Sequence, residues 1–348
     1  MKNNPQKTQK SRREFILSTG KLLGAAAIAG ALPGESALFA ESNKQSAPVI
    51  AQGKPLIIDV HIHTHLPTAI KLPEAPGTRL PTPLELIAKM IEEGISKCVV
   101  LPLVSPECRD VMVTTEEAVE ICSQFPDRLI PFCNVDPRYI TNSTKANFIP
   151  LLTAYKEAGC KGVGEFFPNI PLDDPLNMNL FRQVEEVGLP LLFHLAPKVG
   201  GYYGCYDDPG LPRLEKVLKQ FPKLVILGHS QVFWAEIGFL NNPEERGGYP
   251  RGPIIKEGRL VELMRKYPNL YGDISAGSGH NAISRDPEFG YRFMEEFQDR
   301  LCFGTDYCHV VQELPQVPYF RKLKEGKLIS EEAYEKITWK NASKLLNL

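Results

Sequence analysis

Short apolar runs recur along the chain from residue 56 onward, and amphipathic segments separate them. The runs predict strands at 56–60, 97–103, 129–134, 162–166, 191–194, 224–227, 270–273 and 301–305. Between them, apolar residues three and four positions apart predict helices at 83–93, 115–125, 148–158, 176–187, 212–221, 254–267 and 287–297. Several of these helices begin at proline, a residue favoured in the first helical turn.

The alternation of strands and helices predicts parallel strands joined by crossover helices. Eight strands are the number that closes a (β/α)₈ TIM barrel. An open doubly wound sheet is the alternative, but no Gly-x-Gly-x-x-Gly follows the first strand. We therefore predict an α/β fold with a single barrel domain at 56–348. Long loops after four of the strands would lie on the C-terminal face, where this fold builds its active sites; they are 64–82, 195–210, 230–253 and 274–286.

The first forty residues differ in composition from the rest. A basic region leads to the pair Arg12-Arg13, an Ala- and Gly-rich apolar stretch follows at 22–32, and small residues end the segment. This order predicts a twin-arginine-type signal peptide at 1–40 and a linker at 41–55. The alternative is a membrane anchor, but the apolar stretch is shorter than the ~20 residues that cross a bilayer. We expect an exported protein, periplasmic or extracellular, with the twin-arginine machinery as a partner.

Charge and cysteine placement narrow the class of protein further. The formal net charge is −1, from 40 basic and 41 acidic residues, so no basic field indicates nucleic acid or an anionic membrane. No later apolar stretch predicts a membrane span in the mature form. The sequence leaves open whether the protein forms a homo-oligomer. The eight cysteines show no regular disulfide pattern. Cys98, Cys133 and Cys302 lie in or beside apolar runs, so we expect mostly free, buried thiols.

Histidines gather where the predicted strands end. His61 and His63 lie two apart and so face the same side of a strand, but such a pair alone is weak evidence for a metal. His194, His229 and Asp306 end three later strands, although the chain has only seven histidines. Imidazoles and a carboxylate crowded on an apolar barrel need a metal or strong pairing to offset desolvation. The set therefore predicts a divalent transition metal, Zn²⁺ first and Mn²⁺ or Fe²⁺ as alternatives.

These motifs resemble the amidohydrolase superfamily. The closest branch is the amidohydrolase-related (amidohydrolase 2) group, which includes aminocarboxymuconate-semialdehyde decarboxylase. The resemblance runs from about residue 56 to the last helix, where 341–346 is also similar. It rests on Asp59-x-His61-x-His63, His194, His229 and Gly304-Thr305-Asp306. It implies that His61, His63, His194 and Asp306 bind the metal, that His229 is a further ligand or a catalytic acid/base, and that Asp59 supports the ligands.

Glu165 raises the question of how many ions bind. It ends Gly162-Val163-Gly164-Glu165, which resembles the Gly-x-Gly-Glu of TatD-type hydrolases, where the glutamate is a metal ligand. Many members of the superfamily have a carboxylated lysine here, but Lys161 is badly placed for that role. The alternative is that Glu165 binds substrate or pairs with Arg138. If Glu165 is a ligand, His194 and His229 can complete a second site, so we expect one or two ions.

The resulting hypothesis is a metal-dependent hydrolase. A metal-activated water would attack an ester, lactone, amide or phosphoester of a small molecule. Asp306 would orient the water and take its proton, and His229 would stabilise the oxyanion or protonate the leaving group. Glu165 and export favour this hypothesis. The alternatives are a metal-dependent decarboxylase of an aromatic or unsaturated carboxylic acid and a non-catalytic exported binding protein.

Other residues near the predicted active site carry weaker evidence. Tyr202 lies in an aromatic loop that could stack on a substrate ring or pack as a lid. Trp234 and Arg285 are candidates to line the pocket. Asp273 ends a strand, but we expect it to be structural. We expect three loop histidines to face solvent or lie behind the ligands; they are His65, His280 and His309.

Overall fold

The structure, a computed structural model, describes residues 56–67, 78–107 and 111–348. The predicted signal peptide and linker lie outside these residues. From Gln52 to Leu348 the chain forms one compact unit.

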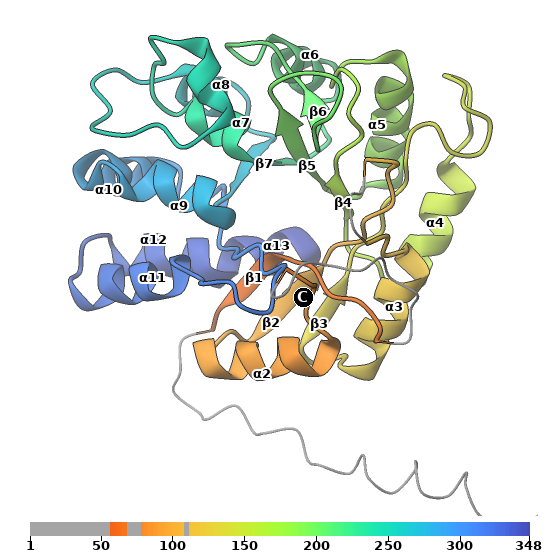
Figure 1. Cartoon of the computed structure of the whole chain (residues 1–348), viewed down its shortest axis with the longest axis horizontal. Coiled ribbons are helices and arrows are strands. Elements are labelled where there is room, and N and C mark those ends of the chain that lie inside the picture. The colour runs from red at the N-terminus through yellow and green to blue at the C-terminus, as the bar shows by residue number, and fades with distance from the viewer. Residues whose placement is uncertain (1–55, 68–77, 108–110) are drawn as a thin grey trace, which may run out of the picture. The chain divides into compact units, whose positions relative to one another are not determined.

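Eight parallel strands form the centre of this unit (Figure 1). They run in two sets, β1-β2-β3 and β4-β5-β7-β8-β9. A ninth strand, β6 (Cys205–Tyr206), has only two residues and pairs with β5 outside the main order. The eight are β1 (Ile58–Ile62), β2 (Lys97–Val100), β3 (Leu129–Pro131), β4 (Val163–Phe166), β5 (Leu191–Ala196), β7 (Ile226–His229), β8 (Leu270–Asp273) and β9 (Leu301–Cys302).

Backbone pairing across two seams closes these sets into a barrel. At one seam Cys133 pairs with Val163 in parallel, and Gly164 N donates to the Cys133 carbonyl at 2.9 Å. At the other seam Ile62 pairs with Tyr307. The predicted single-domain TIM barrel is confirmed.

Helices surround the strands, as Figure 1 shows. Local sequence sets several of their ends: Thr82 and Glu85 form a capping box at the start of α2, and Gly94 ends it in the left-handed conformation. The larger helices are α2 (Pro83–Glu93), α3 (Thr115–Gln124), α4 (Ile149–Glu157), α5 (Pro175–Val187), α6 (Pro212–Gln220), α8 (Arg259–Lys266), α9 (Ala276–Ser284), α10 (Pro287–Glu296) and α11 (Gln316–Glu325). The shorter ones are α7 (Gln231–Ala235), η1 (Pro243–Gly247), α12 (Glu331–Glu335), η2 (Lys336–Lys340) and α13 (Asn341–Leu346).

One predicted helix is too long, and several helices were missed; they are α7, α9, α11, α12 and the short η1 and η2. The predicted helix at 254–267 begins only at Arg259, because Gly258 is extended and caps it. The backbone N–H of Ile254 instead donates to Asp286 Oδ2. Two loops after strands contain α7 and α9. In α9, Gly and Ser weaken the apolar period from which helices are predicted.

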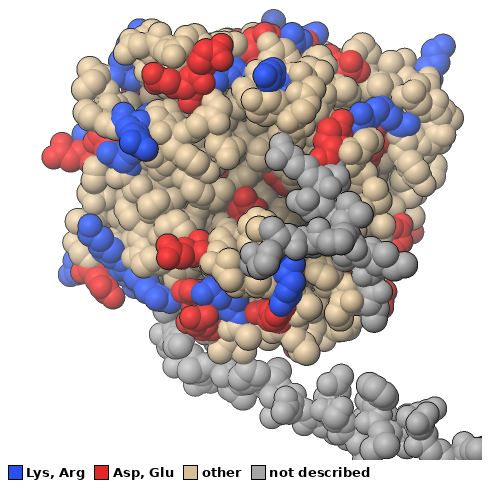
Figure 2. Space-filling model, in the orientation of Figure 1, with Lys and Arg blue, Asp and Glu red and all other residues tan. Residues whose placement is uncertain are grey.

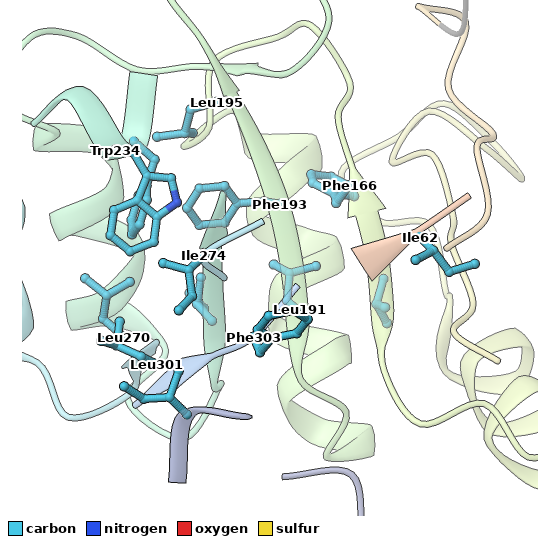
Figure 3. Packing of buried hydrophobic residues seen from close by; sticks show 14 of the residues in the cluster. Ile62, Phe166, Leu191, Phe193, Leu195, Trp234, Leu270, Ile274, Leu301 and Phe303 are labelled. Atoms are coloured by element: carbon cyan, nitrogen blue, oxygen red, sulfur yellow. The ribbon is translucent and has the colours of Figure 1, made fainter. Parts of the chain in front are cut away.

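Apolar side chains fill the barrel below its C-terminal end. A cluster that includes Leu192, Leu227 and Tyr271 lies inside the ring of strands, and Ala342 and Leu346 of α13 join it. A second cluster packs strands against helices, and Figure 3 shows Phe193, Trp234 and other members of it. Leu192 and His194 share one face of β5, and Leu227 and His229 share one face of β7. The polar groups therefore lie directly above an apolar base.

Two further findings concern membrane-spanning helices and the cysteines. None of the helices in the described residues is long and apolar enough to cross a membrane. Seven cysteines within those residues are free thiols, and six of the seven are buried. The raised pKa of the Cys98 and Cys302 thiols follows first from this burial.

Candidate metal centre

Six polar side chains meet at the C-terminal ends of the strands. Cα atoms of His194 and His229 lie opposite each other in the β5–β7 pairing, so their imidazoles are neighbours. Three groups of three residues could each hold a metal ion, because the ligand atoms within each group lie within 4.8 Å of one another. The groups are His61 with His229 and Asp306; His61 with His63 and Glu165; and Glu165 with His194 and His229. Every residue that we predicted as a metal ligand belongs to one of these groups.

Three of these residues place one ligand atom each at mutual distances of 3.2 to 3.6 Å. His61 Nε2 lies 3.2 Å from His63 Nε2 and 3.4 Å from Asp306 Oδ1, and the same carboxylate oxygen lies 3.6 Å from His63 Nε2. Metal–nitrogen bonds of ~2.1 Å in a tetrahedron place neighbouring ligands ~3.4 Å apart. These separations therefore fit three ligands of one ion.

Proton positions in the cluster support the same conclusion. His63 Nδ1 lies 3.0 Å from the Leu101 carbonyl, and His61 Nδ1 lies 2.6 Å from Asp273 Oδ2. A carbonyl or carboxylate oxygen only accepts, so both Nδ1 atoms donate and both neutral rings keep a lone pair on Nε2. When both rings are neutral, those two lone pairs face each other at 3.2 Å. A cation beside them removes this repulsion, so the residues fit a metal.

Asp273 holds two of the imidazoles, and we had expected it to be only structural. Besides His61, its Oδ2 accepts from the Ser275 hydroxyl at 2.9 Å, and Ser275 Oγ accepts in turn from His229 Nδ1 at 2.9 Å. Metal-binding histidines are commonly fixed by such a carboxylate partner. A Cβ at Gly304 would lie 2.6 Å from Asp273 Oδ1, so glycine leaves space for this carboxylate. The rule that found the histidines, a polar residue at a strand end, also applies to Asp273.

The charges in the cluster shift the pKa values of its members. Burial lowers the pKa of His61, but the Asp306, Asp273 and Glu165 carboxylates outweigh it and raise the pKa to about 10. Burial raises the pKa of Asp273, but its imidazole neighbours hold it well below its usual range. Without a metal, the carboxylates of the site therefore favour a protonated, positively charged His61.

Asp59 lies behind the ligands. Its Oδ1 accepts from the backbone N–H groups of His61 and Thr305, both at 3.0 Å, and its Oδ2 accepts from the Thr305 hydroxyl at 2.5 Å. Burial raises the pKa of Asp59 to about 7. These bonds link β1 to the segment that carries Asp306, which adopts the left-handed conformation with φ 56°. Asp59 thus sets the position of ligands on both sides of the barrel seam.

Glu165 forms a hydrogen-bonded group with two neighbours. His194 Nδ1 donates to Glu165 Oε1 at 2.8 Å, and the hydroxyl of Tyr203 donates to Oε2. Burial raises the pKa of Glu165, but hydrogen bonds from His194 and His63 hold it well below its usual range. The alternative pairing with Arg138 is wrong, because that guanidinium binds Asp136 and Glu107.

A cavity of about 520 Å³ opens above the cluster. Figure 2 shows this face hollowed near its centre, with acidic atoms visible inside the hollow. Asp306 and His194 are the most accessible of the six residues, with side chains 22% and 15% exposed. None of the described lining residues is Lys or Arg; they are Thr78, Leu80, Leu103, Val111, His194, Leu195, Pro197, Tyr202, Tyr203, Gln231, Val232, Gly247 and His309.

The weaker candidates separate into two groups. Tyr202 lines the cavity, with Lys198 over its ring at 5.2 Å. Trp234 and Arg285 are not among the lining residues. Trp234 is 1% exposed within the core (Figure 3), and its Nε1 donates to the Asp273 carbonyl at 2.8 Å. Arg285, beside Gly238, is half-buried. Trp234 therefore supports the strand that carries Asp273.

The three loop histidines also differ in position. His309 lines the cavity, and its Nδ1 donates to the Thr78 carbonyl at 2.5 Å. His65 is buried rather than facing solvent. His280 packs edge-on against Tyr319. Only His309 is thus placed to contact a molecule in the cavity.

The chain is similar to a protein family and to several solved structures. A family model described as amidohydrolase matches residues 58–348. No curated protein matches the chain. Three similar solved structures have TM-scores of 0.53 or 0.54, and their identities of 15–17% carry information on the fold alone.

The first is a probable 2-pyrone-4,6-dicarboxylic acid hydrolase from Acinetobacter baumannii with citric acid bound, 16% identical over 84% of this chain and 99% of that one, with a TM-score of 0.53. The second is a 5-carboxyvanillate decarboxylase from Sphingomonas paucimobilis, 15% identical over 85% and 100%, with a TM-score of 0.54. The third is a dihydroxybenzoic acid decarboxylase from Polaromonas sp. JS666 with bound manganese and the inhibitor 2-nitroresorcinol, 17% identical over 85% and 98%, with a TM-score of 0.53.

Proposed function

This chain belongs to the amidohydrolase family, and from that premise we propose that it is a metal-dependent decarboxylase of a small aromatic or unsaturated carboxylic acid. Two similar structures are named as decarboxylases, and one of them holds manganese. This proposal replaces hydrolysis as the first hypothesis. The observation that carries it is the chemistry of the cavity wall.

The cavity wall is mostly apolar and aromatic, with no Lys or Arg among its described residues. A planar unsaturated acid fits such a wall, and among the described lining residues no Lys or Arg competes with the metal centre for its carboxylate. A bound divalent cation would supply a Lewis acid that holds the substrate's oxygen atoms. Loss of CO₂ spreads the charge of a carboxylate into the unsaturated system. An apolar wall opposes this dispersed charge less than the original localised one.

Asp306 is the residue best placed to move the proton. Its Oδ1 faces His61 and His63, whereas its Oδ2 lies 3.8 Å from His229 Nε2. The two oxygens can therefore serve different purposes. In the reaction the C–C bond to the carboxylate breaks, CO₂ leaves, and a proton delivered from the Asp306 side replaces it on carbon. His229 lies beside this carboxylate and has its own Nδ1 fixed by Ser275.

Hydrolysis is the second candidate, and one specific observation favours it. The set Glu165, His194 and His229 could hold a second ion next to the first, and two ions commonly serve hydrolysis. A similar structure is named as a probable pyrone dicarboxylic acid hydrolase. In this case Asp306 would take a proton from the attacking water instead of giving one to carbon.

The two reactions differ in their products. The mature chain, stripped of metal and reloaded with Mn²⁺ or Zn²⁺, would be incubated with hydroxybenzoic acids, with unsaturated diacids and with lactones and esters of such acids. We expect release of CO₂ and consumption of one proton for each acid used. Ring opening or ester cleavage that releases acid without CO₂ would instead support hydrolysis.

The role of Asp306 can be tested in the same assay. Asp306→Asn should lower kcat by about 10²- to 10⁴-fold, because it removes the proton donor. Its metal content should be measured in parallel, since Asp306 is also a proposed ligand. Asp299→Asn, at a surface carboxylate that pairs with Lys336, is the matched control and should keep full activity.

We also propose that residues 1–40 direct twin-arginine export to the periplasm or the exterior. The pair Arg12-Arg13 ahead of a weakly apolar stretch supports this. The free thiols in the described chain suit a protein that folds in a reducing compartment before transport.

A further inference from the structure

Tyr203 covers Glu165 on the side of the cavity. Tyr203 lines the cavity, whereas the Glu165 side chain beneath it is only 2% exposed. The phenol hydroxyl donates to Glu165 Oε2, and His194 Nδ1 donates to Oε1 at 2.8 Å. Each carboxylate oxygen therefore already accepts a hydrogen bond from a neighbouring side chain.

Packing fixes the ring of Tyr203 in this position. It stacks on Phe167 with a centroid distance of 4.2 Å and an interplanar angle of 16°. It also meets the His194 ring edge-on at 4.7 Å. The next residue is Gly204, with φ 114°, where a Cβ would lie 2.7 Å from His194 Cδ2. The loop can approach the imidazole this closely only with glycine at that position.

These contacts bear on the number of ions. Each Glu165 oxygen keeps a second lone pair, but a second ion bound through His194 Nδ1 needs His194 to release its hydrogen bond to that carboxylate. The set His61, His63 and Asp306 makes no such demand, because its Nε2 atoms already face one another. The two parts of the centre are therefore not equally available to a metal.

We propose that Tyr203 is a positioning residue whose hydroxyl holds Glu165 in its pair with His194 and thereby limits the centre to one ion. This inference rests on the metal centre but not on the reaction. Counting ions needs no substrate, so failure here is distinct from failure of the proposed decarboxylation.

Tyr203→Phe tests the inference, because it removes the hydroxyl and keeps the ring that packs on Phe167 and His194. Metal-free protein would be titrated with Mn²⁺, and bound ions would be counted after equilibrium dialysis. We expect one ion per wild-type chain and a rise toward two in Tyr203→Phe. The electron paramagnetic resonance spectrum of the variant should gain the signal of two spin-coupled Mn²⁺ ions, which a change in packing alone would not produce.

Tyr202→Phe is the matched control, since Tyr202 also lines the cavity but its hydroxyl makes no hydrogen bond to Glu165 in the described chain; it should still bind one ion. Tyr203→Leu also lacks the hydroxyl and provides a second variant if the first folds poorly. Two ions in the wild-type chain would overturn the inference. So would a folded Tyr203→Phe protein that still binds one ion with no coupled signal.

Discussion

At the scale of single residues, one buried carboxylate orders much of the metal centre. Asp273 Oδ2 accepts directly from His61 and, through Ser275, supports His229. Its imidazole neighbours hold its pKa well below the usual range, so it is ionised at neutral pH. It therefore fixes which nitrogen of each ring carries the proton and leaves Nε2 free for a metal.

Replacing Asp273 with Asn should weaken metal binding by about 10- to 100-fold, because the carboxylate partner of His61 loses its charge. The measurement is competition for Zn²⁺ or Mn²⁺ against a chromophoric chelator. Asp299→Asn serves again as the control. An unchanged metal affinity in Asp273→Asn would show that this carboxylate does not support the ligands.

At the scale of elements, short local signals set the ends of helices and hold the frame of the barrel. The capping box of α2 is one example: Thr82 N donates to Glu85 Oε2 at 2.9 Å, and Arg79 Nη1 donates to the same oxygen at 2.8 Å. These bonds, first of all that from Arg79, lower the pKa of Glu85 to about 2. The ionised carboxylate thus stabilises the folded state.

Glu85→Gln should lower the free energy of unfolding by about 1 kcal/mol at pH 6. Because the pKa of Glu85 is lower in the folded state, its stabilisation is complete above the usual value of 4.5 and is lost as pH falls toward 2. The difference between wild type and variant should therefore shrink over that range in urea unfolding. Glu186→Gln, at an exposed position of α5, is the control. A difference that stays constant with pH would contradict the assignment.

At the scale of the whole molecule, the metal centre crosses the seam at which the barrel closes. His61 lies in β1 and His63 directly follows it, whereas Asp306 follows β9, and the seam pairs Ile62 with Tyr307. A metal bound by these residues would connect the first and last strands of the ring. Binding should accordingly stabilise the entire fold as well as prepare the active site.

Removal of the metal should lower Tm reversibly. A ligand present at 100 times its Kd adds about 2.7 kcal/mol to the free energy of unfolding. Differential scanning calorimetry before and after chelation, and again after reloading, would measure this change. The double variant His61→Ala and His63→Ala should show no response to metal, whereas a shift in that variant would place the stabilising ion elsewhere.

The export proposal also belongs to this scale. Arg12→Lys together with Arg13→Lys should retain the full-length precursor in the cytoplasm, because the export machinery reads the arginine pair. Cell fractionation with an antibody against the barrel would measure the distribution. Lys7→Arg leaves that pair intact and should be exported normally. Equal export of the double variant would argue against this route.

The sequence by itself determined the barrel and most of the polar residues that meet at its C-terminal end. Strand and helix periods are local properties, and a rule about strand ends was enough to select His61, His63, His194, His229 and Asp306. It missed the ligand-holding role of Asp273, the partner of Arg138, and the contact of Tyr203 with Glu165. These depend on which strands and loops lie side by side after closure. Hydrogen bonds between residues 38 to 212 positions apart leave no periodic trace in the chain, so only the tertiary structure decided them.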